Sequence, residues 1–302
     1  MDFLRPADWS EALEAKAKHP EATPIAGGTD VMVELNFDHR RPEILLDLSR
    51  VEQLRQWSRL PEAQGGVLRL GAGVPYSRLI DEVGTALPGL AMAARTVGSP
   101  QIRNRGTLGG NLVSASPAGD GHPPLIASGA EVEVESVRAS RTVPVAEFFT
   151  GVKKTVLAED ELVAAIRVPE ATGPQQFSKI GTRNAMVIAV CTFAVALHPR
   201  RETVGTGIGS AAPTPRAVSE AEEFLAAELA ERDQWRRPTP LPESVVDRFA
   251  ELVVNATAPI DDVRGTARYR THALGVLARR TLGWAWEEYR NSAETAGRQG
   301  CA

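Results

Sequence analysis

The segment Ile102–Asp120, IRNRGTLGGNLVSASPAGD, constrains the fold of this chain more than any other stretch. It sets Gly109 and Gly110 side by side after an Arg-Asn-Arg run and ends in a Ser-Pro turn that leads to Asp120. Glycines have a large ordering cost on folding and no side chain to bury, so we expect neither a regular helix nor a strand here. A chain tolerates that cost where its backbone must approach another group closely.

A second glycine loop, Ala26-Gly27-Gly28-Thr29-Asp30, also lies between apolar segments. Like Thr107-Leu108-Gly109-Gly110-Asn111, it combines two glycines with a threonine. Successive backbone N–H groups can form a concave anion site, and a hydroxyl adds a donor. Each loop alone is more typical of a tight turn. Two such loops facing each other would suit a diphosphate.

The familiar phosphate-binding motifs do not match. The chain contains no G-x-x-x-x-G-K-[ST], which excludes a P-loop. Gly71-x-Gly73 lacks the third glycine of the Rossmann fingerprint. A dinucleotide would therefore have to be held by another fold.

Composition narrows the class of protein. The 302 residues predict two domains, and a hydrophobic content of 43% supplies a core for them. A net charge of -4 gives no basic footprint for nucleic acid or an anionic membrane surface. No apolar run reaches the roughly 18–20 residues of a membrane span, and the first residues form no apolar signal core. We therefore expect a cytoplasmic protein.

Cysteine and histidine usage argues against a bound metal. The chain has two cysteines, Cys191 within an apolar run and Cys301. Iron–sulfur clusters usually require four thiolates, and a structural zinc site of the usual cysteine type also requires more cysteines than this chain has. His122 has no histidine or cysteine partner at ligand spacing. We predict no metal site.

The pattern of short helices and strands predicts two domains of α+β type. A polar segment with Gly and Pro, Glu170–Gln176, marks the boundary. The predicted domains are residues 1–172 and 173–290, followed by a polar, flexible tail over residues 291–302.

The second domain begins with three apolar strand patterns and continues with three helical ones. The strands, FSKIGTR, MVIAVCTFAVALH and ETVGTGIGSAA, are expected to form one antiparallel sheet. The last helical pattern repeats at near-helical spacing, which predicts a mostly buried face containing Tyr269, Ala273, Val276, Leu277, Arg280 and Trp284.

At this point the chain resembles a known family. AGGTD together with IRNRGTLGGNLVSASPAGD is similar to the FAD-binding medium subunit of the molybdenum hydroxylases, the xanthine dehydrogenase and carbon monoxide dehydrogenase family. RTVPVAEFFTGVKKTVLAEDELVAAIRVP and FSKIGTRNAMVIAV resemble the end of the family's first domain and the start of its second. GIGSAAPTPRAVSEAE and YRTHALGVLARRTL resemble its carboxyl-terminal domain.

This resemblance implies a fold of the vanillyl-alcohol-oxidase (PCMH) type, with two α+β subdomains that hold FAD and a smaller domain with a three-stranded antiparallel sheet and a helical bundle. It implies that the first loop wraps the diphosphate and that the second closes it from the other side. It also places an acidic residue, an apolar residue and a lysine beside the cofactor. The implied FAD-binding residues are Ala26, Gly27, Gly28, Thr29, Asp30, Thr107, Gly109, Gly110, Asn111, Asp120, Val163 and Lys179.

The residues alone leave other roles open. Asp120 is also a plausible turn residue, Lys179 a solvated strand lysine and Val163 plain core. Arg103 and Arg105 could neutralise phosphate or form surface ion pairs.

The family divides its chemistry among chains. The resemblance implies a large molybdenum-cofactor subunit that oxidises the substrate and a small subunit with [2Fe–2S] clusters, assembled as a dimer of heterotrimers. This chain would accept electrons on noncovalent FAD, because the first loop has no histidine for a covalent link. The cofactor does the redox chemistry, so no catalytic side chain is expected. Many relatives carry an acidic residue near the start of the second domain, where this chain has Met186-Val187.

Two other functions remain open. The chain could be a self-contained FAD oxidoreductase of the same fold, although no side-chain acid for that chemistry is evident. It could also be a scaffold subunit that has lost FAD, against which the intact glycine loops argue.

Overall fold

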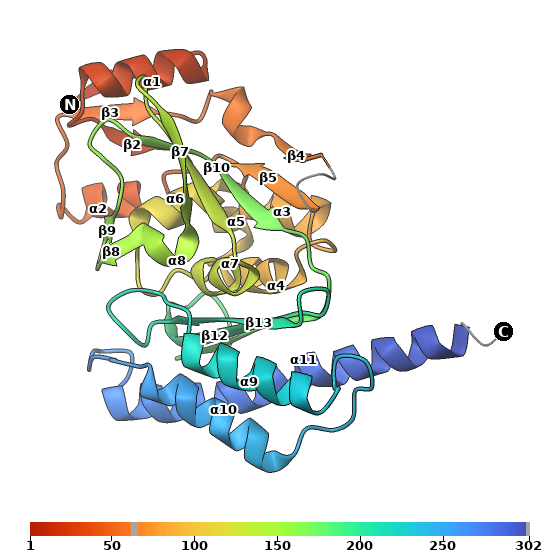
Figure 1. Ribbon diagram of the computed structural model, residues 1–302. Helices are drawn as coiled ribbons and strands as arrows, with labels where there is room; N and C mark the ends of the chain where they lie inside the picture. The colour runs from red at the N-terminus through yellow and green to blue at the C-terminus, as the bar shows by residue number, and fades with distance from the viewer. Residues whose placement is uncertain (62–65, 300–302) are drawn as a thin grey trace. The chain divides into compact units, whose positions relative to one another are not determined.

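The computed structural model describes residues 1–61 and 66–299, and it divides into two compact units (Figure 1). Unit 1 consists of residues 1–84, 94–116 and 129–170, and unit 2 consists of residues 85–93, 117–128 and 171–302. The last crossing between the units, at residue 170, falls at the polar segment that marks the boundary in the sequence. Two short segments from the amino-terminal part nevertheless belong to unit 2.

A small parallel sheet in unit 1 carries the first glycine loop. It has the order β1-β3-β2, with β1 at Asp2–Leu4, β2 at Thr23–Ile25 and β3 at Ile44–Asp47. Helix α1 (Trp9–Lys18) connects β1 to β2, and the Asp8 side chain caps it by accepting from the Glu11 amide at 2.9 Å. The glycine loop follows β2 directly and leads into α2 (Val31–Asn36).

The larger sheet of unit 1 has five antiparallel strands in the order β4-β5-β10-β6-β7. The strands are β4 (Trp57–Arg59), β5 (Val67–Gly71), β6 (Glu131–Glu135), β7 (Ser140–Pro144) and β10 (Leu162–Pro169). Short elements cover and connect it: η1 (Glu52–Arg55), α3 (Tyr76–Glu82), α5 (Pro100–Arg105), α6 (Leu108–Ser114), α8 (Val145–Phe148), β8 (Phe149–Gly151) and β9 (Lys154–Thr155).

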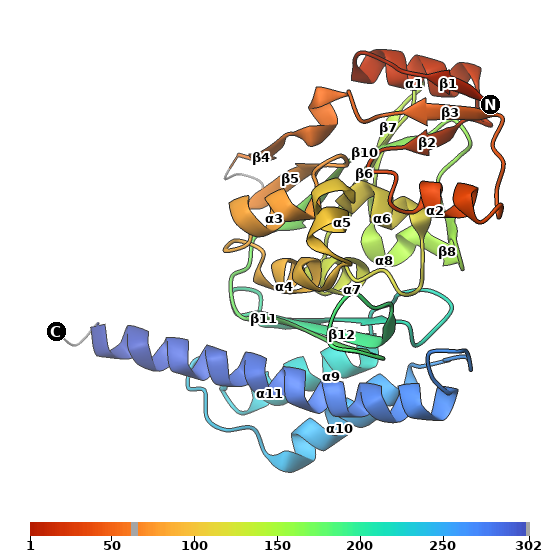
Figure 2. The same cartoon turned by 180° about the vertical axis from the view of Figure 1, so that it is seen from behind.

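Unit 2 is built on the predicted antiparallel sheet, in the order β11-β12-β13. The strands are β11 (Gln175–Gly181), β12 (Ala189–His198) and β13 (Thr203–Gly209). The central strand, β12, is buried along its whole length because helices cover both faces of the sheet, as Figures 1 and 2 show. Those helices are α4 (Pro88–Thr96, which extends into unit 1), α7 (His122–Ser128), α9 (Ser219–Glu231), α10 (Glu243–Asn255) and α11 (Ala267–Gln299).

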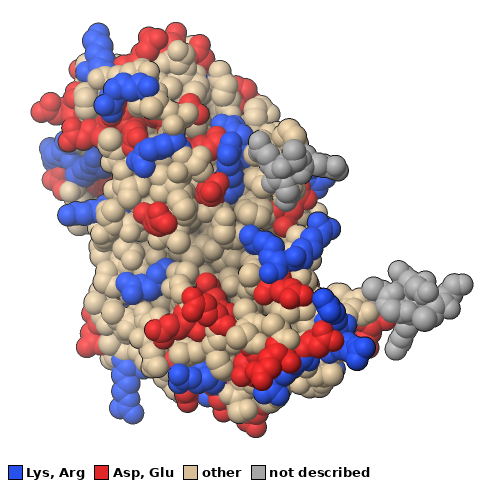
Figure 3. All heavy atoms as spheres, in the orientation of Figure 1, with Lys and Arg blue, Asp and Glu red and all other residues tan. Residues whose placement is uncertain are grey.

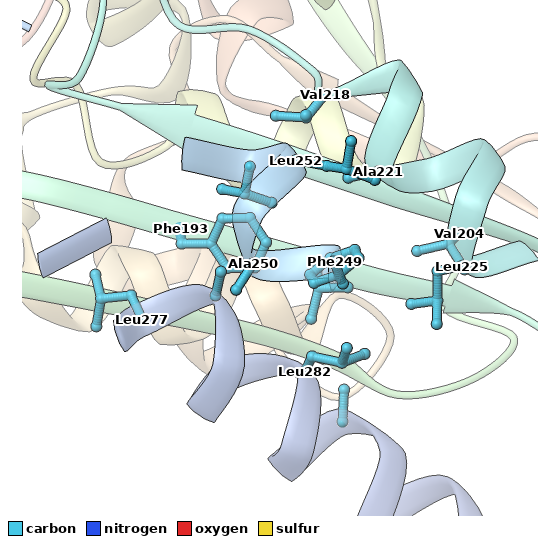
Figure 4. Close-up of a cluster of buried hydrophobic side chains, with 14 of the residues drawn as sticks. Phe193, Val204, Val218, Ala221, Leu225, Phe249, Ala250, Leu252, Leu277 and Leu282 are labelled. Atoms are coloured by element: carbon cyan, nitrogen blue, oxygen red, sulfur yellow. The ribbon is translucent and has the colours of Figure 1, made fainter. Parts of the chain in front are cut away.

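The main core of unit 2 lies between the sheet and α9–α11 (Figure 4). Phe193 of β12 meets Phe249 of α10 edge to face, with ring centroids 6.1 Å apart. On the opposite face of the sheet, Gly205 and Gly207 bring the backbone of β13 against α7. A Cβ atom on either glycine would overlap a carbonyl oxygen, of Ala127 and Pro123 respectively. The alternate glycines of ETVGTGIGSAA therefore let a helix lie directly on the strand.

The mixed α+β fold is confirmed, with a three-stranded antiparallel sheet followed by helices. Several local predictions were wrong. Residues on both sides of Gly106 are helical, in α5 and α6. In α11, Ala273 and Leu277 of the predicted face are buried, but Tyr269 and Trp284 are about half exposed, and Arg270, Leu274 and Ala285 are buried in their place.

The expected flexible tail is helical as far as Gln299, and Cys301 lies outside the described residues. In the part of the chain that the structure describes, no helix combines the length and apolar character needed to cross a membrane.

Candidate functional site

The two glycine loops lie against each other in unit 1. A Cβ atom on Gly27 would overlap the backbone carbonyl of Arg105. A Cβ atom on Gly106 would come within 3.3 Å of the Thr29 hydroxyl oxygen. The absence of side chains at these two positions therefore lets segments far apart in the sequence meet backbone to backbone.

The first loop presents a run of available amides. Among the described residues, none of the backbone N–H groups from Gly27 to Asp30 donates to a backbone carbonyl. Gly28 has φ of 76°, a left-handed conformation that side chains rarely adopt. Consecutive amides in a turn with one left-handed residue form the concave anion site known as a nest. The loop has the donors that a phosphate group requires.

The second loop uses its amides differently. Its residues open α6, where the Thr107 hydroxyl accepts from the Gly110 amide at 3.0 Å and the Thr107 carbonyl accepts from the Asn111 amide at 3.0 Å. The Gly109 amide donates to the carbonyl of Ala72 at 3.0 Å. These groups are satisfied within the protein, so this loop is a scaffold with little amide capacity left for a ligand.

Gly109 and Gly110 have different surroundings. A Cβ atom on Gly109 would lie 2.5 Å from Cβ of Ala72, so this glycine is required for packing. At Gly110 a Cβ would approach only the Thr107 hydroxyl, at 3.0 Å. The open space beyond Gly110 is the part of this loop that a ligand can approach most closely.

Val163 belongs to the same part of unit 1. It lies on β10 with 5% of its surface exposed, at a bulge between Val163 and Ala165 in the pairing with β6. The carbonyl of Ala164 accepts from the Ala72 amide at 3.0 Å. Since Ala72 also supports Gly109, the bulge links Val163 to the second glycine loop.

Asp120 and Lys179 meet each other in unit 2. Nζ of Lys179 donates to Oδ2 of Asp120 at 2.6 Å, and each side chain is 8% exposed. Sequence reasoning assigned each residue to the cofactor separately and missed their pairing. Neither is a solvated surface residue, because a buried carboxylate and a buried ammonium are retained only where they satisfy each other or further partners.

The charged residues that flank the second loop either form hydrogen bonds outside the loop or are exposed. Arg103 donates to the carbonyls of Val97 and Gly98 at 3.0 and 3.1 Å, so it closes the turn before α5. Arg105 is exposed, and His122 is fully buried in α7. Across residues 1–61 and 66–299, no group of three or more His, Cys, Asp or Glu side chains is arranged to hold a metal ion.

Asp30, at the end of the first loop, has altered electrostatics. Desolvation raises the pKa of its carboxyl above the usual value, and the nearby Lys153 ammonium opposes that shift. Lys153 itself donates to Oε1 of Glu34 at 2.6 Å. The turn between β8 and β9 thus places a cation beside the first loop, which sequence reasoning did not anticipate.

The segment after β5 is a further part of the site that sequence reasoning missed. Val74 accepts from the Leu108 amide at 3.2 Å, and the Tyr76 amide donates to the Gly106 carbonyl at 3.1 Å. Gly71 and Gly73, which fail as a nucleotide fingerprint, pack against the backbone of Leu54. In the sequence, the two glycines of GAGV could have indicated this segment, because glycine within a strand pattern marks close backbone packing.

Comparisons with known proteins agree with this arrangement. Residues 1–171 match the model of the FAD binding domain in molybdopterin dehydrogenase, and residues 176–285 match the CO dehydrogenase flavoprotein C-terminal domain. The chain is 30% identical to the xanthine dehydrogenase FAD-binding subunit of Escherichia coli O157:H7 over 291 residues, covering 93% of this chain and 94% of the relative.

Two further comparisons concern carbon monoxide dehydrogenase from Hydrogenophaga pseudoflava. Its medium chain is 30% identical over 275 residues, covering 88% of this chain and 90% of the relative. A solved structure of that enzyme superimposes with a TM-score of 0.86 at 28% identity, covering 96% of this chain and 98% of the other.

The fold and the site define a flavoprotein subunit of a multi-chain oxidoreductase. The chain belongs to the FAD-binding subunits of the molybdopterin dehydrogenases, the xanthine and carbon monoxide dehydrogenase family.

Proposed function

We propose that this chain carries noncovalent FAD as the electron-transfer subunit of a molybdenum hydroxylase complex. It receives electrons from [2Fe–2S] clusters on a small partner chain and passes them to an external acceptor. A large molybdenum-cofactor chain oxidises the substrate, and the complex is a dimer of heterotrimers. The support is the family membership and the names of the relatives, which are subunits or medium chains of such dehydrogenases.

The observation that carries the proposal is the first glycine loop. Its amides from Gly27 to Asp30 have no backbone acceptor among the described residues, and Gly28 holds a left-handed conformation of the kind that occurs in anion-binding nests. A diphosphate supplies the missing acceptors. The second loop packs against this one, and it offers the open side of Gly110 to the same ligand.

The other assigned residues have supporting roles. Val163 supplies an apolar surface for the flavin ring, and the Asp120–Lys179 pair supplies a fixed dipole in unit 2. FAD, when bound, supplies the conversion between two-electron and one-electron transfer. The protein holds and orients it, and we assign no catalytic acid or base.

A direct experiment uses the purified full chain. We expect one FAD per chain, released into the supernatant by acid precipitation, and an oxidised flavin spectrum that dithionite bleaches. FAD that stays with the precipitated protein would contradict noncovalent binding. A colourless chain that takes up no FAD from solution would favour the scaffold function instead.

A further inference from the structure

Lys153 lies in the turn between β8 and β9, which runs beside α2 in Figures 1 and 2. Its amide donates to the carbonyl of Ala115 at 3.1 Å, and Ala115 is the C-cap of α6. Its ammonium donates to Oε1 of Glu34 in α2 at 2.6 Å. The first glycine loop leads into α2 and the second opens α6, so this one residue joins the helices that belong to both loops.

The backbone at this junction has an uncommon conformation. Lys153 has φ of 55° and Ala115 has φ of 46°, so both are left-handed although neither is glycine. Such conformations carry strain, persist only where the surrounding structure determines them, and gather at functional sites. The turn therefore gives the Lys153 side chain a defined origin next to α2.

The segment between the first glycine loop and β3 carries an excess of negative charge. Within residues 27–43 at pH 7 there are four carboxylates and two guanidinium groups, with His39 neutral: Asp30, Glu34, Asp38 and Glu43 against Arg40 and Arg41. Arg41 donates to Oδ2 of Asp38 at 3.0 Å. In Figure 3, acidic and basic side chains lie intermixed at the left edge, over α2. A diphosphate bound at this loop would be repelled by its own segment, so a compensating cation must come from another part of the chain.

Lys153 supplies a positive charge that acts on the first loop. Desolvation raises the pKa of Asp30, the last residue of the loop; the charge of Lys153 opposes this shift, and the charge of Glu34 adds to it. An anion held by the loop amides would experience the same charges. It would be attracted by Lys153 and repelled by Glu34 and Asp30.

We propose that Lys153 is a further cofactor-binding residue, whose ammonium compensates the negative charge of the FAD diphosphate at the first glycine loop. This rests on the proposed function and adds to it a cation that belongs to neither loop. Glu34 holds the ammonium beside α2, but its own negative charge opposes the ligand. The two members of this ion pair therefore differ in their effect on FAD affinity.

The test measures the FAD dissociation constant of the full chain by fluorescence titration, after removal of the flavin, at ionic strengths of about 0.02 and 0.3 M. Lys153→Gln removes the positive charge but leaves an amide that can still donate to Glu34, and Lys153→Arg keeps the charge. Glu34→Gln removes the opposing charge. Lys154→Gln is the matched control, because it changes the net charge equally at a neighbouring side chain that lies by Gly151, where a Cβ atom would be 3.7 Å from Cδ of Lys154.

At low ionic strength we expect Lys153→Gln to weaken FAD binding at least about threefold, and this loss should shrink at high ionic strength because salt screens the attraction. Glu34→Gln should bind FAD at least as tightly as wild type. Lys153→Arg and Lys154→Gln should stay within about twofold of wild type.

Weaker binding in both Lys153→Gln and Glu34→Gln would show that the ion pair only shapes α2, and would overturn the proposal. Wild-type affinity in Lys153→Gln, or an equal loss in Lys154→Gln, would overturn it as well. Urea unfolding of the FAD-free variants separates these results from a loss of folding, and if Lys153→Gln does not fold, weaker binding in Glu34→Gln alone decides against Lys153. A wild-type chain that binds no FAD would overturn the proposed function instead.

Discussion

At the scale of single residues, the glycines of the two loops have different structural roles. Gly27 and Gly109 are required because a side chain would overlap the protein's own atoms, at Arg105 and Ala72. Gly28 is required for its backbone conformation, with φ of 76°. Sequence reasoning attributed all of them to contact with a pyrophosphate. The amides from Gly27 to Asp30 have no backbone acceptor among the described residues, which is why we propose ligand contact there, whereas close packing accounts for Gly27 and Gly109 themselves.

Gly28→Val should abolish FAD binding while the chain still folds, because a β-branched residue disfavours the left-handed conformation that orients the loop amides. Gly129→Val is a matched control: Gly129 has φ of 72°, and a Cβ there meets no atom within 4 Å. Both variants carry similar backbone strain of about 1–3 kcal/mol. Flavin fluorescence titration should therefore separate them, and stoichiometric FAD in Gly28→Val would remove the loop from the site.

Asp120→Asn should lower the free energy of unfolding by about 3 kcal/mol, since it leaves the Lys179 ammonium buried without its charged partner. Chemical denaturation of the FAD-free chain measures this effect apart from ligand affinity. Lys179→Met combined with Asp120→Asn should recover part of the loss. If Asp120→Asn alone has no effect on stability, the buried pair at 2.6 Å does not stabilise unit 2.

At the scale of elements, hydrophobic patterns predicted the elements of unit 2 well, and glycine content misled the prediction around Gly106. The strands of unit 2 and the helices α9–α11 were all expected, because the apolar residues of each follow a clear strand or helix pattern. Helices α5 and α6 were missed because glycine propensity argued against them. Thr107 caps α6, and packing of Gly109 on Ala72 overrides that propensity. The buried face of α11 was predicted only in part, because the amphipathic Tyr269 and Trp284 were counted as core.

Strand β12 ends in a buried titratable group, which makes stability depend on pH. Burial lowers the pKa of His198, and the hydrogen bond from its ring to the Ala127 carbonyl opposes that shift only in part. The unfolded state therefore binds more protons just below pH 6.5, so stability falls as the pH drops through that range. Urea unfolding at pH 7.5 and 5.5 should show a smaller difference for His198→Gln than for wild type. Equal differences would mean that His198 does not contribute.

At the scale of the whole chain, the two compact units are not continuous in sequence, because the chain passes between them more than once. Residues 117–128 come from the amino-terminal part, yet α7 packs on Gly205 and Gly207 of β13. Sequence patterns locate a polar linker, but they do not show that an earlier segment folds back into the later sheet. The Asp120–Lys179 pair depends on the same return of the chain, so it too could not be derived from local patterns.

A protease site inserted directly after Thr172, which is exposed, should be cut without separating the two fragments. Residues 85–93 and 117–128 would hold the amino-terminal fragment to unit 2. Gel filtration should give one particle under native conditions and two fragments in denaturant. Independent elution of the fragments without denaturant would show that these segments do not bind unit 2 stably.

The most direct measurement of the central claim is anaerobic flavin reduction with and without partner chains. The isolated chain should stay yellow with purines, aldehydes, aromatic heterocycles or carbon monoxide, and should bleach with dithionite. Addition of the cluster-bearing and molybdenum-bearing chains should make bleaching depend on the substrate of the complex. An isolated chain that oxidises an organic substrate at about 1 s⁻¹ or faster would contradict the account and establish a self-contained flavoenzyme.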